Sequence, residues 1–186
     1  MPSEFHTAGR HMVRGDGFSA LVEAARLEFE HGFIGTNTNA IAKRAGYAPQ
    51  TFYRHFPNKR AIFIAVYNRW TEEEDRALAV SHSSEDIAEA LITHHKRYRV
   101  FRRSLRMLTV EDDEVGSARS KARLAQIAAI RTRSNVFSSL KLADQVEKLL
   151  TIERICDAAA DGEFERLGVD EIDAKALIVQ MVSRLL

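Results

Sequence analysis

The side chains with the clearest capacity for chemistry lie in a polar and basic stretch over residues 36–59. If Phe52 and Phe56 form the inner face of a helix, steps of 100° per residue place Gln50 and Arg54 nearly opposite them. Polar side chains of this kind can reach base edges when a helix enters the major groove of DNA. The pattern therefore predicts a helix that binds double-stranded DNA.

A tight corner must position this helix. The residues Gly46-Tyr47-Ala48 form a three-residue turn between it and a shorter helix expected over 37–45, which Gly46 ends. Pro49 then falls in the first turn of the second helix, where proline is tolerated, and this helix is expected to end at Phe56. Two short helices joined in this way are typical of a helix-turn-helix.

The distribution of charge agrees with a surface that meets phosphate. The 186-residue chain has a net charge of only +1, but between His31 and Trp70 there are six basic residues and no acidic one. From Asp144 to Asp173 there are ten acidic residues and three basic ones. A positive region beside an acidic body favours one DNA-binding face, although chance clustering would also explain the charge alone.

The remaining pattern predicts an all-α fold. Apolar residues recur at helical spacing from Phe18 onward, and alternating strand patterns are missing. Thr36 is the expected cap of the helix over 37–45, and long helices are expected over 116–138 and 142–160. Three parts are predicted: a flexible arm over 1–15, a three-helix head over 16–63 with its helix-turn-helix at about 37–56, and a helical body over 64–186.

Composition argues against several classes of protein. No stretch approaches ~18 uninterrupted apolar residues, and the N-terminus lacks the apolar core of a secretory signal. A single cysteine, Cys156, cannot form an internal disulfide, so a cytoplasmic protein is expected. Adjacent His94 and His95 lack the spacing that places two imidazoles on one helical face. No metal, cofactor or membrane association is predicted.

The stretch from Gly32 to Lys59 resembles the DNA-binding head of TetR-type transcriptional regulators, and the resemblance covers roughly residues 17–70. Its spacing has no gaps. Two departures concern Ala48, which stands where the family usually has a Ser or Thr cap, and the pair Asn37 and Asn39, which replace commoner residues. The matching residues are Gly32, Phe33, Thr36, Ile41, Ala42, Ala45, Gly46, Tyr47, Thr51, Phe52, Tyr53, His55, Phe56, Asn58 and Lys59.

The resemblance implies a role for each part of the head. The start of the first short helix would hold phosphates, the start of the second would enter the major groove with Gln50 as the base reader, and later residues would bind the DNA backbone. The predicted DNA-binding residues are Thr36, Asn37, Thr38, Pro49, Gln50, Thr51, Tyr53, Arg54, His55 and Lys59.

The same resemblance implies that the body binds a small effector and forms a homodimer through its last two long helices. A two-fold dimer would read a palindromic operator. A basic cluster on the middle helices could bind an anionic effector or could simply be a solvated face. The candidate effector-binding residues are His94, His95, Tyr98, Arg102 and Arg106.

These features favour a repressor that an effector releases from its operator. An activator or an effector-independent DNA binder is a second interpretation. A small helical enzyme with His94 or His95 as base is a third, but no glycine-rich phosphate loop, metal spacing or nucleophile–base pattern supports it. A protein-interaction module would leave the face without acidic residues unexplained.

Overall fold

The computed structural model describes residues 17–185, and in this range every regular element is a helix. The prediction of an all-α fold is confirmed. The predicted arm over 1–15 and Leu186 lie outside the described residues. The elements are α1 (Gly17–Glu28), the 3₁₀ turn η1 (Phe29–His31), α2 (Gly32–Gly35), α3 (Thr38–Arg44), α4 (Pro49–His55), α5 (Lys59–Ala79), α6 (Ser84–Arg97), α7 (Arg99–Glu111), α8 (Asp113–Arg133), α9 (Asn135–Ser139), α10 (Leu142–Asp161), α11 (Glu163–Arg166) and α12 (Glu171–Ser183).

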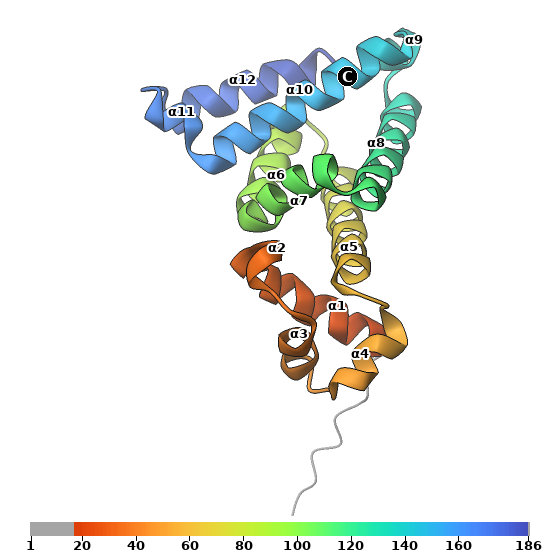
Figure 1. The fold of residues 1–186 in the computed structure, drawn as a ribbon. Helices are drawn as coiled ribbons and strands as arrows, with labels where there is room; N and C mark the ends of the chain where they lie inside the picture. Colours follow the sequence, from red (N-terminus) through yellow and green to blue (C-terminus); the bar gives the residue numbers. More distant parts are fainter. Residues whose placement is uncertain (1–16, 186) are drawn as a thin grey trace, which may run out of the picture.

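The helices form two connected groups (Figure 1). Helices α1, α3 and α4 lie together at one end, α10 and α12 lie side by side at the other, and α5 leads from the first group into the second. Since α5 runs unbroken from Lys59 to Ala79, the predicted boundary between residues 63 and 64 falls inside a continuous helix.

Aromatic side chains fill the core of the first group and extend it into the second. Phe29 and Phe63 meet edge to face with ring centroids 5.0 Å apart, and Phe101 of α7 lies 4.6 Å from Phe63. The side chains of Phe29 and Phe63 are fully buried. The head is thus packed directly on α7 through apolar contacts, which stabilise the arrangement through the burial of large aromatic surfaces.

Several helix ends follow local rules that the sequence displays. Asn58 caps α5 by accepting a hydrogen bond from the N–H of Ala61 at 2.9 Å. Ser83 and Asp86 form a reciprocal capping box at the start of α6. Asp170 caps α12 as expected, accepting from the N–H of Asp173 at 2.8 Å.

Other expectations were wrong. The cap of α3 is Asn37, whose side chain accepts from the N–H of Ala40 at 2.9 Å, while Thr36 is turned inward. The helix expected over 116–138 is broken at Ser134, where the backbone becomes extended and the hydroxyl accepts from the N–H of Phe137.

Candidate DNA-binding surface and ligand cavity

The corner between α3 and α4 is built around a glycine. Gly46 has a φ of 76°, a conformation that an L side chain adopts at a cost of roughly 1 kcal/mol or more. The N–H of Tyr47 donates to the carbonyl of Ala42 at 2.9 Å, and the N–H of Gly46 donates to that of Lys43 at 3.1 Å. These bonds close the end of α3 and turn the chain at once into α4, as expected for a helix-turn-helix.

Helix α4 has one buried and one exposed side, as its periodicity predicts. Phe52 and Phe56 are buried, while the opposite side of the helix is open to solvent. Thr51 is half-buried on the flank. The exposed predicted contacts on this helix are Pro49, Gln50, Tyr53, Arg54 and His55.

Helices α3 and α4 present their polar groups on a shared surface. The hydroxyls of Thr38 and Tyr53 lie 3.0 Å apart in a hydrogen bond that joins the start of α3 to the middle of α4. Asn37 is exposed directly before Thr38. Of the predicted DNA contacts, this geometry brings together the exposed residues of α4 with Asn37 and Thr38.

The remaining two predicted contacts, Thr36 and Lys59, are directed into the protein. Thr36 is 3% exposed, and its hydroxyl contacts the carbonyls of Glu28 at 2.7 Å and Gly32 at 2.9 Å. The Lys59 ammonium donates to the carbonyls of Phe33 at 2.7 Å and Thr36 at 2.8 Å. Both side chains hold the segment before α3 in place.

The Lys59 ammonium is also set over an aromatic ring. Its nitrogen lies 4.2 Å from the ring centroid of Phe33, within the range of a cation–π contact. Burial lowers the pKa of the Lys59 ammonium. The side chain therefore ties α5 to the segment that precedes α3.

Ion pairs engage three of the six basic residues that the sequence places in this region. Arg44 pairs with Glu28 at 2.5 Å, and Arg60 pairs with Asp112 at 2.9 Å. Arg69 lies within 4 Å of carboxylates of Glu23 and Glu73. Lys59 donates to main-chain carbonyls instead, and within residues 17–185 Lys43 and Arg54 have no ion-pair partner and are exposed on α3 and α4.

The candidate effector residues do not form a common site. His94 is buried with its ring 4.9 Å from that of Trp70, and Tyr98 donates its hydroxyl proton to Glu73. Burial, followed by that hydrogen bond, raises the pKa of Tyr98 to about 12. His95 alone of the five predicted residues lines the internal cavity of the body.

Two of the predicted arginines form ion pairs with acidic residues of α10. Arg102 is buried against Asp157, and Arg106 reaches Asp157 at 2.5 Å and Asp161 at 3.0 Å. Because two carboxylates neutralise these guanidinium groups, this part of the basic run forms an ion-pair cluster between α7 and α10. Its neighbour Lys96 pairs with Glu171 on α12.

The internal cavity has a volume of about 320 Å³ and lies between α5, α6, α8, α10 and the end of α12. Its walls are mostly apolar, with a few polar groups from α5, α6, α8 and α10. Its lining includes Tyr67, Trp70, Glu74, Gln126, Phe137 and Cys156. In the sequence analysis, none of these residues was assigned to a ligand site. Glu74 lies in a run of acidic residues, and nothing in that run indicates that the side chain of Glu74 would be buried.

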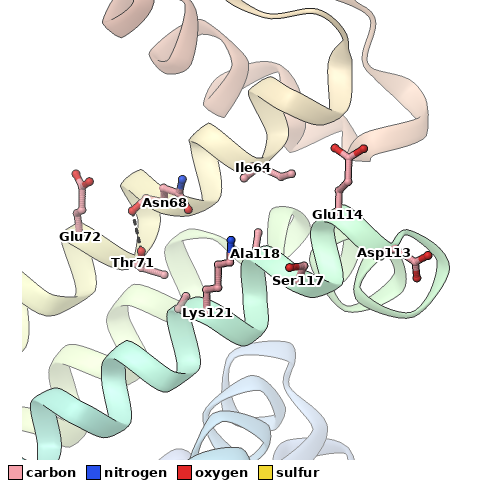
Figure 2. A pocket seen from close by; sticks show the side chains of 10 residues that line it. Ile64, Asn68, Thr71, Glu72, Asp113, Glu114, Ser117, Ala118 and Lys121 are labelled. Carbon is pink, nitrogen blue, oxygen red and sulfur yellow. Dashed lines mark hydrogen bonds between the residues drawn. The ribbon is translucent and has the colours of Figure 1, made fainter.

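A second hollow, of about 800 Å³, lies between α5 and α8 (Figure 2). Lys121 points from α8 toward α5, and Thr71 donates its hydroxyl proton to the carbonyl of Asn68 at 2.7 Å. None of its lining residues has a buried polar atom without a partner. Because ligand sites are concave and mainly apolar, the internal cavity is the better candidate site.

Among residues 17–185, no helix is long and apolar enough to cross a membrane. The same residues contain no group of three His, Cys, Asp or Glu side chains arranged to hold a metal ion.

Comparison with known proteins identifies the head. Residues 20–66 match the family model described as bacterial regulatory proteins, tetR family. No curated protein matches the sequence at a significant level.

Solved structures share the fold over nearly the whole chain. A transcriptional regulator from Rhodococcus sp. Rha1 has a TM-score of 0.69 at 13% identity, covering 92% of this chain and 96% of its own. A tetR family transcription regulator from Shewanella sp. PV-4 has a TM-score of 0.67 at 20% identity, covering 90% and 96%. SmeT in its complex with triclosan has a TM-score of 0.56 at 18% identity, covering 89% of both chains. Residues 20–66 thus match the tetR family model, and the helical chain as a whole has the fold of these solved structures.

Proposed function

We propose that this protein is a sequence-specific repressor that binds a palindromic operator as a homodimer and leaves it when a small molecule enters the internal cavity. The observation that supports DNA reading is the surface shared by α3 and α4. It presents Gln50, Tyr53 and Thr38 together, with Lys43 and Arg54 free of ion pairs in the described part of the chain. Such a regulator would act in the cytoplasm, where it meets the DNA.

The side chains of this surface would make different contacts with DNA, according to how far each one reaches. Gln50, exposed in the first turn of α4, would read a base edge, because its amide can both donate and accept hydrogen bonds in the major groove. Asn37, Thr38, Tyr53 and His55 would contact phosphates, which position the protein without conveying sequence. Pro49, Thr51 and Arg54 would lie beside them at the groove.

A dimer is proposed because one α4 reads only one half-site. Its contact would use the outward sides of α10 and α12, where Leu150 and Leu177 are exposed large apolar residues. The opposite sides of these helices already pack on α6 within the chain. Two-fold symmetry would then place the two α4 helices at half-sites about 34 Å apart.

Release by a ligand is proposed from the position of α5. Its first turns pack in the head through Ile62 and Phe63, and its later turns line the cavity through Trp70 and Glu74. A ligand that binds more tightly to one position of α5 than to another would shift the equilibrium between the two positions. The difference in affinity sets the size of this shift, and the spacing of the two heads would change with it. SmeT, a neighbour in fold, has been solved with triclosan bound.

The test begins with selection of duplexes from a random DNA pool, followed by fluorescence anisotropy at several salt concentrations. We expect a palindrome, weaker binding for Gln50→Ala and Tyr53→Ala, and a preference relaxed by ~1–3 kcal/mol at one base position for Gln50→Ala. Lys43→Ala should lower the salt slope by about 1. Lys121→Ala, an exposed lysine of the body, is the matched control and should leave it unchanged. Failure to enrich any duplex would contradict DNA reading.

An activator is the alternative within regulation. Deletion of the gene should raise transcription from the selected operator if the protein represses it. A fall in transcription would instead assign activation.

A further inference from the structure

We propose that the internal cavity binds an amphipathic amine in its protonated form, with the ammonium at Glu74 and the apolar part among the side chains between α5, α6, α8 and α10. This inference rests on the proposed function, because it takes the cavity to be the effector site. It goes further by assigning the chemical class of the ligand.

Glu74 is a buried carboxylate within the cavity wall. It is 4% exposed, and one oxygen accepts a hydrogen bond from the Gln126 amide at 2.7 Å. Its other oxygen lies 3.6 Å from Nε2 of His95. Among the described residues, no lysine or arginine lies within ion-pair distance of Glu74. A buried carboxylate without a full cationic partner is expensive, so a ligand cation there would bind favourably.

Of the other two cavity acids, Glu153 is paired with guanidinium groups and Asp75 is exposed to solvent. Glu153 receives two hydrogen bonds from Arg123, at 3.0 and 2.6 Å, and also pairs with Arg119. Burial and the charge of Glu74 raise the pKa of Asp75, and Arg133 opposes that rise. Arg123 is therefore occupied, whereas Glu74 is a buried cavity acid with no Arg or Lys partner among residues 17–185.

His95 does not supply the missing counter-charge of Glu74, because its imidazole also contacts Asp157. Its Nδ1 lies 3.0 Å from Asp157, which is itself bound by Arg102 and Arg106. The Nε2 side faces Glu74 at the longer distance of 3.6 Å. His95 thus joins the α10 ion-pair cluster on one side and leaves the Glu74 carboxylate with a weaker contact on the other.

The remaining wall is suited to an apolar body. Tyr67, Trp70 and Phe137 contribute aromatic surface, and aliphatic side chains complete the wall. The indole N–H of Trp70 is buried and has no hydrogen-bond acceptor in the described part of the chain. A ligand with an ammonium at one end and an oxygen acceptor along its body would give Glu74 a counter-charge and the Trp70 N–H an acceptor. The volume of about 320 Å³ limits it to a small molecule.

The chain provides its own probe for this test, because Trp70 is its only tryptophan and lines the cavity. Decylamine, decanol and decanoate share one chain length and differ in the charge of the head group. Each would be titrated into the full-length protein, without DNA and below its micellar concentration, while Trp70 fluorescence is followed. We expect decylamine to bind at least about tenfold more tightly than either of the others.

Two variants assign the preference to Glu74. Glu74→Gln keeps the shape of the side chain and should reduce the affinity for decylamine to that for decanol. Glu72→Gln, which changes an exposed acid one half-turn earlier on α5, should retain the wild-type preference. Thermal unfolding of each variant would verify its fold.

Several results would overturn the assignment. Equal or tighter binding of decanoate would mean that the cavity arginines select an anion, and equal binding of decanol would mean that Glu74 does not act as a counter-charge. A preference that survives in Glu74→Gln would place the ammonium elsewhere. Addition of decylamine to a preformed operator complex is measured separately. Binding without release of DNA would contradict the proposed effector mechanism and leave the ligand class intact.

Discussion

Replacement of Lys59 by methionine distinguishes a structural role from a DNA contact. The structure gives this ammonium two hydrogen bonds to main-chain carbonyls and a cation–π contact with Phe33. The resemblance to the family instead implies a phosphate contact for the same residue. The two roles predict different measurements.

The cost of Lys59→Met can be worked from these contacts. A hydrogen bond to a charged group contributes about 1.5–3 kcal/mol when buried, and a cation–π contact adds about 0.5–1 kcal/mol. Lys59 is half-buried, so solvent weakens each contact, and we expect a total loss of about 2–3 kcal/mol. For a chain of this size the Tm should fall by roughly 5–10 °C.

The assay combines thermal unfolding with DNA titration. Lys59→Met is expected to lower the Tm and to leave the salt slope of operator binding close to that of the wild type, because its ammonium is already engaged. Lys43→Met is the matched control, because this lysine is exposed. It should change the free energy of unfolding by less than about 0.5 kcal/mol and reduce the salt slope of DNA binding by about 1. Equal Tm values for the two variants, with a reduced slope for Lys59→Met, would refute the structural role.

Three further changes test other parts of the fold. Ala48→Ser should supply the side-chain cap that α4 lacks and stabilise the protein by about 1 kcal/mol in thermal unfolding, and an unchanged Tm would contradict this. Thr36→Val should destabilise by ~1–2 kcal/mol in denaturant titration, because two hydroxyl contacts to buried carbonyls are lost, whereas a neutral effect would show that these contacts are dispensable. Burial raises the pKa of Glu153, but Arg119 and Arg123 outweigh it and hold the pKa below its ordinary value of 4.5. The unfolded chain therefore binds more protons than the folded chain as the pH falls through that range. Wild-type stability should fall more steeply below about pH 4.5 than that of Glu153→Gln. Parallel stability curves for the two proteins would count against the ion pairs.

Local features of the sequence were sufficient for much of the head. Pro49 and Asn58 mark the starts of α4 and α5, and the spacing of Phe52 and Phe56 identifies the inner face of α4. Such signals are readable because capping and helical periodicity depend on residues a few positions apart. The exposed position of Gln50 follows from the same geometry.

The direction of Thr36 and Lys59 could not be read in this way. Their positions match the family pattern, but their polar atoms are bound to carbonyls of the segment between α1 and α3. Whether a polar side chain faces DNA or a main-chain carbonyl depends on the path of that segment. The path in turn depends on the packing of Phe29 and Phe33 against α5 and α7.

The ligand cavity shows most clearly what the sequence alone determined and what only the tertiary structure decided. The sequence determined that α5 and α6 are helices, because each has its own cap and apolar stripe. Glu74 belongs to a run of four acids, which by itself is typical of a solvated face. Only the packing of α8 and α10 against α5 and α6 places Glu74 inside and supplies Arg102 and Arg106 with carboxylates some fifty residues away. Burial of a charge and the identity of its partner are properties of the assembled helices, because the residues that create them are brought together only by the fold.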